Sequence, residues 1–207
     1  MRFAYADPPY PGQAYQYRGH PDYAGEVDHA ALVGRLCQDY PDGWALSTNA
    51  TSVQYIWGLC PADVRVAAWH VTSQPPPGAL HGWQRVWEPV IVRGGRLRPV
   101  RDVLECGASG QVRTFIGAKP PAFTRWMLAL LGAEPDDTID DLFPGSGAIG
   151  RAIESWRRQP ELYVWRNKSA SRNPKRIARD LRLSGNPSLL GEFPAQEPAG
   201  RGSGGGG

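Results

Sequence analysis

Four consecutive residues near the start of the chain, Asp7-Pro8-Pro9-Tyr10, combine groups that suit chemistry on an amino nitrogen attached to an aromatic ring. Such a nitrogen is a poor nucleophile because its lone pair is delocalised, unless its hydrogens are held out of the ring plane. An ionised Asp7 can accept one hydrogen and the Pro8 carbonyl the other, since the Pro-Pro step removes two N–H donors and fixes φ. Tyr10 offers a ring for stacking. The tetrapeptide therefore indicates methylation of an exocyclic amino group, although a Pro-Pro pair after a strand also occurs as an ordinary turn.

A second motif, Asp141-Leu142-Phe143-Pro144-Gly145-Ser146-Gly147, lies between an expected strand from Thr138 and an expected helix from Ala148 to about Trp156. Gly145 and Gly147 permit positive φ and a close approach of the backbone to a ligand. The first N–H groups of the helix have no partner within it and point toward any anion above them. Glycine turns before helices are common structural features, but this strand-turn-helix setting favours a site for a carboxylate or phosphate.

In this order, the two motifs resemble the beta class of amino methyltransferases, in which the catalytic tetrapeptide precedes the S-adenosylmethionine loop. The resemblance spans residues 3 to 165 and includes Trp87–Val92, similar to a late strand of that family, and the Lys119-Pro120 step before its cofactor helix. It implies an α/β fold, a circularly permuted Rossmann-like sheet with helices on both faces and ligands at the carboxyl ends of the strands. It also implies a set of residues that bind S-adenosylmethionine: Lys119, Asp141, Phe143, Gly145, Ser146 and Gly147.

The same resemblance implies direct transfer of the sulfonium methyl to the amino nitrogen, without a covalent enzyme intermediate. Asp7 and the Pro8 carbonyl would hold the amino hydrogens, Pro9 would fix the bend, and Tyr10 would stack on a base that has left the duplex. By the same resemblance, an aspartate at the first position favours adenine N6 over cytosine N4, and DNA is the expected substrate. Three alternatives stay open: cytosine N4 as the target, RNA or a free nucleotide as the substrate, and an inert relative that only binds nucleic acid.

Two features depart from the family pattern. Asp140 occupies a strand position that is usually apolar. The next strand, expected at Glu161–Trp165, should end in an acid that binds the cofactor ribose, but Trp165 and Arg166 stand there instead. We therefore expect a sheet shortened at its C-terminal end, or a cofactor that is held differently.

Between the motifs, the hydrophobic pattern predicts alternating strands and helices. The expected strands are Phe3–Ala6, Trp44–Thr48, Val64–Trp69 and Val86–Val92, and the expected helices are Ala30–Tyr40, Val53–Leu59 and Ala122–Leu131, the last one ending at Gly132. Five tryptophans fall on these elements and are expected in the core: Trp44, Trp57, Trp69, Trp87 and Trp126.

The irregular segment after the tetrapeptide is where we expect contacts with nucleic acid, because loops carry binding residues more often than cores do. Aromatic rings together with an arginine can stack on an extruded base and pair with neighbouring phosphates. The residues in question are Tyr15, Tyr17, Arg18, His20 and Tyr23. A second irregular segment, Val71–Arg85, contains three prolines and Trp83, and a packed polyproline turn explains it equally well.

Composition is consistent with one compact domain: 41% of the 207 residues are hydrophobic and 21% are charged. We place the methyltransferase domain at 1–165, a basic extension at 166–184 that either tracks phosphates or is a solvated tail, and a disordered Gly/Pro-rich tail at 185–207. The net charge of +3 adds little to this assignment.

Three widely spaced cysteines and scattered histidines suggest neither a disulfide framework nor a metal site. The sequence has no long apolar run and no secretory signal pattern, so we expect a cytoplasmic protein without membrane contact. DNA, or alternatively RNA, is the expected partner, and nothing in the sequence calls for an obligate protein partner.

Overall fold

A computed structural model of the chain describes residues 1–20, 23–72, 86–108 and 118–160. The chain divides into two units, Met1–Ala170 and Ser171–Gly207, and the described residues all belong to the first. The expected strand at 161–165, the basic extension and the Gly/Pro-rich tail therefore lie outside the described residues, as does most of Val71–Arg85.

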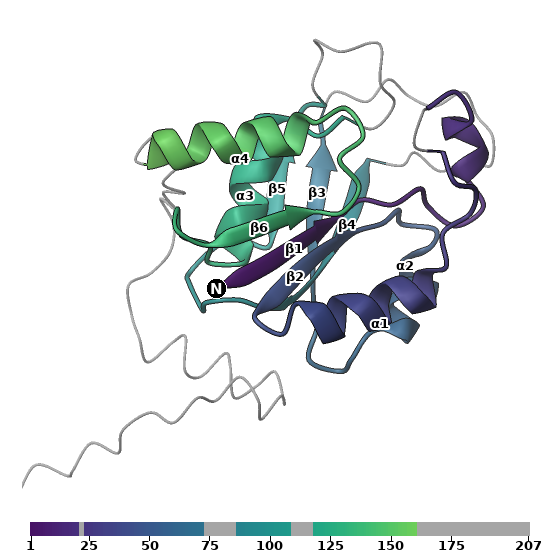
Figure 1. Ribbon diagram of the computed structural model, residues 1–207, viewed down its shortest axis with the longest axis horizontal. Coiled ribbons are helices and arrows are strands. Elements are labelled where there is room, and N and C mark those ends of the chain that lie inside the picture. The colour runs from purple at the N-terminus through teal and green to yellow at the C-terminus, as the bar shows by residue number, and fades with distance from the viewer. Residues whose placement is uncertain (21–22, 73–85, 109–117, 161–207) are drawn as a thin grey trace, which may run out of the picture. The chain divides into compact units, whose positions relative to one another are not determined.

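Six strands form one sheet, in the order β5-β3-β4-β2-β1-β6 (Figure 1). Their bounds are β1 Arg2–Ala6, β2 Gly43–Ser47, β3 Arg65–Val71, β4 Trp87–Gly94, β5 Val103–Cys106 and β6 Thr138–Asp141. β1 is parallel to both of its neighbours, β2 and β6, whereas β4 is inserted antiparallel between β2 and β3. The carboxyl ends of β1, β2, β3 and β6 consequently share one edge of the sheet with the start of β4.

The helices cover both faces of this sheet. The α-helices are α1 His29–Asp39, α2 Val53–Leu59, α3 Pro121–Leu130 and α4 Ala148–Arg158, and a short 3-10 helix, η1, covers Ala14–Tyr17. Figure 1 shows α3 and α4 on one side of the sheet and α1 and α2 on the other. Phe3 and Tyr5 of β1 pack with the α3 and α4 side chains, whereas Ala4 and Ala6 pack with those of α1 and α2. β1 is therefore buried on both faces, as its apolar run predicts.

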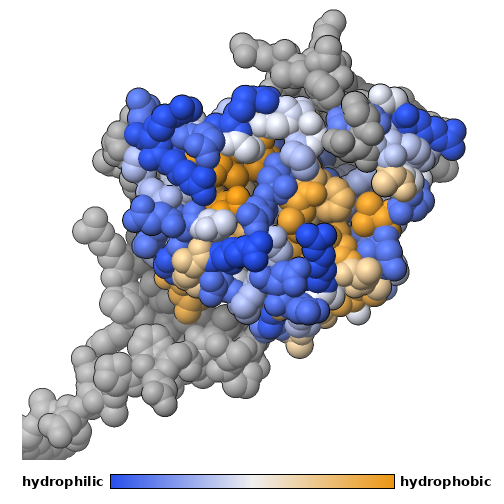
Figure 2. Space-filling view, viewed as in Figure 1, coloured by the Kyte–Doolittle hydropathy of each residue, from blue (hydrophilic) through white to orange (hydrophobic). Residues whose placement is uncertain are grey.

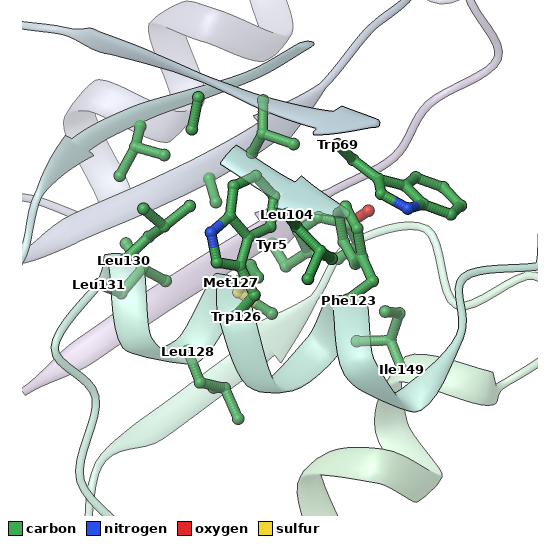
Figure 3. Close-up of a cluster of buried hydrophobic side chains, with 14 of the residues drawn as sticks. Tyr5, Trp69, Leu104, Phe123, Trp126, Met127, Leu128, Leu130, Leu131 and Ile149 are labelled. Atoms are coloured by element: carbon green, nitrogen blue, oxygen red, sulfur yellow. The ribbon is translucent and has the colours of Figure 1, made fainter. Parts of the chain in front are cut away.

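Aromatic packing fixes α3 against the sheet (Figure 3). The Phe123 ring lies 5.8 Å from the Tyr5 ring and 5.3 Å from the Trp69 ring, centre to centre. The Trp126 indole is buried and donates to the Arg101 carbonyl at 2.8 Å. Lys119 and Pro120 directly precede α3, so this packing also determines where Lys119 lies.

The structure confirms the α/β fold class and, with shifts at their ends, the expected strands and helices that lie within the described residues. β5 was not predicted. Trp57 and Trp87 were expected in the core, and that prediction is wrong, since they are 50% and 38% exposed. α2 is short and presents only its Ile56 side to the core, and Trp87 lies at the very start of β4.

Asp140, the polar residue at an expected apolar position, faces two partners. Its Oδ2 accepts from Arg2 Nη2 at 2.7 Å and from the Tyr40 hydroxyl at 2.9 Å.

In the described part of the chain, no helix combines the length and the apolar character needed to cross a membrane.

Candidate active site at the carboxyl ends of β1 and β6

The two sequence motifs meet because the strands that carry them are adjacent and parallel. Asp7 follows β1, Leu142 follows β6, and the Leu142 N–H donates to the Tyr5 carbonyl at 2.9 Å. A cavity of about 740 Å³ opens between the two loops, and Asp7, Pro9, Lys119, Phe143, Gly145 and Ser146 are among the residues that line it. Figure 2 shows apolar residues gathered on this face between α4 and α1. The carboxyl edge of an open α/β sheet is the usual place for a ligand.

The loop after β6 exposes backbone donors at the start of α4. Gly147 is the N-cap residue, with φ of 71°, and Gly145 has φ of 45°. No side chain of the described residues caps this helix, and its first turn carries no acid. Its first N–H groups are thus available for an anionic group, which the helix dipole also favours.

Asp141 brings an acceptor to the same loop. Its Oδ1 accepts from the Phe143 N–H at 3.3 Å, while its Oδ2 is buried and has no hydrogen-bond partner among the described residues. Burial, assisted by the charge of Asp7, raises the pKa of Asp141 to about 6. A buried carboxylate oxygen without a partner is costly, so a ligand that donates to it gains free energy at this position.

A buried ammonium group holds the Asp7 carboxylate. Lys119 Nζ lies 2.9 Å from Asp7 Oδ2 and 3.1 Å from Asp7 Oδ1, and its side chain is only 3% exposed. The same Nζ donates to Glu88 Oε2 at 3.2 Å, and the Tyr10 hydroxyl donates to this oxygen at 3.1 Å. Three aromatic ring centres lie near Nζ: that of Tyr10 at 6.0 Å, that of Trp69 at 5.6 Å and that of Phe123 at 5.8 Å.

Burial and charge act in opposite directions on this pair. Burial raises the pKa of Asp7, and the Lys119 ammonium works against that rise. Burial lowers the pKa of Lys119, but the Asp7 carboxylate outweighs it, with help from Glu88, and the pKa ends well above its ordinary value. Lys119 is therefore a permanent cation near neutral pH, and its contact with Asp7 favours the carboxylate form.

No protein-family model matches the sequence, and no curated protein matches it. Solved structures do match the fold. The M1.HpyAVI–SAM complex superposes with a TM-score of 0.53 at 14% identity, over 76% of this chain and 78% of that chain. A second structure, of M1.HpyAVI, superposes with a TM-score of 0.50 at 14% identity, over 76% of this chain and 77% of that chain. The fold is that of a Rossmann-like methyltransferase.

In this methyltransferase fold, the residues predicted to bind cofactor lie together. Lys119, Phe143, Gly145 and Ser146 line the cavity, and Asp141 at the end of β6 and Gly147 at the N-cap of α4 flank the loop between them. Lys119 differs from the rest because its ammonium contacts Asp7 and Glu88, which groups it with the tetrapeptide.

Some residues of the tetrapeptide and of the loop after it line the cavity, and others do not. Asp7 and Pro9 line it, Pro8 is buried, and Tyr10 turns its hydroxyl toward Glu88. Of the residues predicted to contact nucleic acid, Tyr17, His20 and Tyr23 line the cavity, whereas Tyr15, which is 56% exposed, and Arg18 do not.

Sequence reasoning missed Glu88. It was read only as part of a strand, although a single acid next to a proline in an otherwise apolar run is unusual in a buried strand and was a usable signal. Tyr5 was not predicted as a site residue either. It lines the cavity, and its hydroxyl forms a hydrogen bond of 2.9 Å with Ser47 Oγ.

Proposed function

We propose that this protein is an S-adenosylmethionine-dependent methyltransferase of the beta class that methylates the exocyclic amino group of adenine, N6, in DNA. One observation carries the proposal: Asp7, in contact with the Lys119 ammonium at the end of β1, faces the same cavity as the glycine loop after β6. A methyl donor bound by that loop and an amino group bound by Asp7 would occupy one enclosed space.

The cofactor half of the cavity suits S-adenosylmethionine. The N–H groups at the start of α4 fit its carboxylate, and the unpaired Oδ2 of Asp141 fits one of its donor groups. The cofactor could approach the backbone closely at the small residues Gly145, Ser146 and Gly147. Phe143 would pack against the cofactor. When bound, the cofactor supplies an electrophilic methyl group. The similar M1.HpyAVI structure was solved with SAM, which supports the same cofactor here.

The target half suits a planar base with an amino group. Asp7 would accept one amino hydrogen and the Pro8 carbonyl the other, which localises the nitrogen lone pair toward the methyl donor. Pro9 fixes the chain direction and Tyr10 supplies a stacking ring. Because Asp7 and Pro9 line a cavity, the base would have to leave the duplex to reach them, at a cost of a few kcal/mol.

Nucleic acid would reach the cavity along the segment after the tetrapeptide. Tyr17, His20 and Tyr23 line the cavity and could contact the flipped nucleotide, while the exposed Tyr15 and Arg18 could contact its neighbours. DNA is the substrate we propose, and RNA or a cytosine target is an outcome of the experiment below.

The deciding experiment incubates purified protein with methyl-labelled S-adenosylmethionine and mixed-sequence duplex DNA, followed by digestion and separation of nucleosides. Asp7→Asn and an RNA substrate run in parallel. Label in N6-methyldeoxyadenosine that disappears in Asp7→Asn supports the proposal. Label in N4-methylcytosine or only in RNA changes the target. If folded protein still binds nucleic acid but transfers no label to any base, the proposed activity fails and the protein is a nucleic-acid-binding protein.

A further inference from the structure

The contacts of Glu88 and Lys119 give these residues a role beyond the tetrapeptide. We propose that Glu88 and Lys119 are positioning residues for the target base: Lys119 aims the Asp7 carboxylate and Glu88 aims the Tyr10 ring, and the two are joined by one partly buried contact. The inference rests on the proposed function for its kinetic part, whereas its structural part can be tested without any substrate.

Lys119 has little freedom to serve any other partner. Its side chain is 3% exposed and near three aromatic rings, and its ammonium contacts the carboxylates of both Asp7 and Glu88. A buried ammonium without counter-ions would be strongly destabilising, so these carboxylates fix its place. Because Nζ contacts both Asp7 oxygens, it orients the carboxylate plane as well as its charge.

Glu88 provides the fixed end of the contact. It lies on β4, whose neighbours on both sides pair with it, and it is opposite Trp69 of β3. The next residue, Pro89, accepts from the Thr48 N–H at 3.1 Å, which anchors this part of the strand to the end of β2. A single oxygen, Oε2, receives both the Tyr10 hydroxyl and Lys119 Nζ. Glu88 therefore couples the group that binds the amino hydrogens to the ring that stacks on the base.

The charges of the cluster also fit a methyl transfer. With Asp7, Glu88 and Lys119 all ionised, the three groups carry a net charge of −1. When the S–CH3 bond of the sulfonium breaks, the donor leaves as a neutral thioether and the positive charge passes to the amino nitrogen, which then loses one proton. A fixed negative environment beside the nitrogen stabilises that charge as it develops. A neutral Asp7–Lys119 pair without Glu88 would offer less of this stabilisation.

Several groups face Asp7, and their effects can be separated. They are Lys119, Glu88, Tyr10, Tyr5, Tyr17 and, across the cavity, Asp141. The Glu88 charge raises the pKa of Asp7 and the Lys119 charge lowers it. Removal of each charge should therefore move the titration of Asp7 in opposite directions, which a purely structural role of either residue would not produce.

The test follows the Asp7 carboxyl carbon by NMR in protein labelled with ¹³C-aspartate, titrated without cofactor or substrate and assigned with Asp7→Asn. We expect the midpoint to fall in Glu88→Gln and to rise in Lys119→Gln. Lys119→Arg, which retains the charge, keeps the test usable if Lys119→Gln does not fold, and its midpoint should stay near the wild-type value. Asp63→Asn is the matched control, because Asp63 pairs with Arg93 away from the cavity. A midpoint that moves in neither Glu88→Gln nor Lys119→Gln, or moves equally in Asp63→Asn, would overturn the proposal.

Kinetics then separate positioning from cofactor binding. In Glu88→Gln we expect kcat to fall by up to about 100-fold while the Kd for S-adenosylmethionine, measured by calorimetry, is unchanged. A loss of cofactor affinity with kcat unchanged would instead assign the cluster to the cofactor. If wild-type protein transfers no methyl group at all, the proposed function fails, and the NMR titration still decides whether Glu88 and Lys119 set the state of Asp7.

Discussion

Two clusters of charged side chains lie at opposite ends of β1 and β6, and they are built in opposite ways. At the carboxyl ends, the site cluster of Asp7, Glu88 and Lys119 has two carboxylates for one cation. At the amino ends, the Asp137 cluster surrounds one carboxylate with donors. Each joins distant parts of the chain, but their balance of donors and acceptors differs.

Asp137 is 4% exposed and fully supplied with donors. It accepts from Arg96 Nη1 at 2.5 Å and Nη2 at 3.0 Å, from the Glu134 N–H at 2.7 Å, and from the Met1 amino group at 2.7 Å. The Arg96 hydrogen bonds hold the pKa of Asp137 well below its usual range. Such an arrangement contributes stability and leaves no lone pair for a ligand.

The site cluster and nearby Asp141 have acceptors to spare. Burial raises the pKa of Asp7 and of Asp141, and Asp141 Oδ2 has no partner among the described residues. The contrast shows how to distinguish a binding carboxylate from a structural one in this fold. The structural one is saturated with donors, and the binding one keeps oxygen atoms free for the hydrogens of a ligand.

The largest effect should come from Asp7→Asn. The amide cannot accept as the carboxylate does, so we expect methyl transfer to fall about 10²- to 10³-fold, by analogy with removal of one preorganised electrostatic group. The free energy of unfolding, measured with urea, should also fall, because the buried Lys119 ammonium loses one of its two carboxylate partners and keeps Glu88. Full activity in Asp7→Asn would contradict the proposed difference between the site cluster, which binds a ligand, and the Asp137 cluster, which is structural.

Asp137→Asn should lower stability alone and leave activity intact. It leaves Arg96 without its main counter-ion and loses charged hydrogen bonds, so we expect the free energy of unfolding to fall by about 2 kcal/mol. Methyl transfer per folded molecule should be unchanged. The pKa of Asp137 is depressed by folding, so its contribution is present above the ordinary carboxyl pKa and is lost as pH falls below about 4. The difference between wild type and variant in urea titrations should therefore be smaller at pH 3 than at pH 7.

Asp141 sharpens the comparison because its pKa is shifted upward. A carboxyl raised by folding from 3.8 to about 6 binds its proton more tightly in the native state, so its contribution to stability grows as pH falls through 6 and is unfavourable above it. Asp141→Asn should accordingly stabilise the protein at pH 7 by about 1 kcal/mol while it weakens cofactor binding. Thermal unfolding and calorimetry on the same samples test both halves. Stabilisation without weaker binding would remove Asp141 from the site.

The smallest effect concerns the backbone of the glycine loop. Gly147 has φ of 71°, where a side chain is strained, so Gly147→Ala should cost about 1 kcal/mol. Gly150→Ala is the matched control, since Gly150 lies within α4 with nothing near its added carbon, and alanine there should stabilise by up to about 1 kcal/mol. Equal effects in urea unfolding would contradict the assigned loop conformation.

The sequence allowed the two motifs to be placed at the ends of strands, because hydrophobic runs, prolines and glycines are local signals. β5 escaped prediction because Val103–Cys106 is short and contains Glu105. The partnership of Glu88 with Lys119 depends on the insertion of β4 between β2 and β3, which is a non-local pairing. Asp140 looked anomalous only because its partners, Arg2 and Tyr40, lie far away in the sequence.

The pairing of β1 with β6 also has a consequence for the time course of folding. Phe3 leaves the ribosome well before its neighbour Ile139, which follows only after β2, β3, β4 and β5 have been synthesised. At about 5–20 residues per second, that delay is on the order of ten seconds. Until then, β1 has an open edge, and Asp7 has no glycine loop beside it. The nascent chain therefore acquires its cavity in one late step, and a chaperone that shields an unpaired apolar strand would act in this interval.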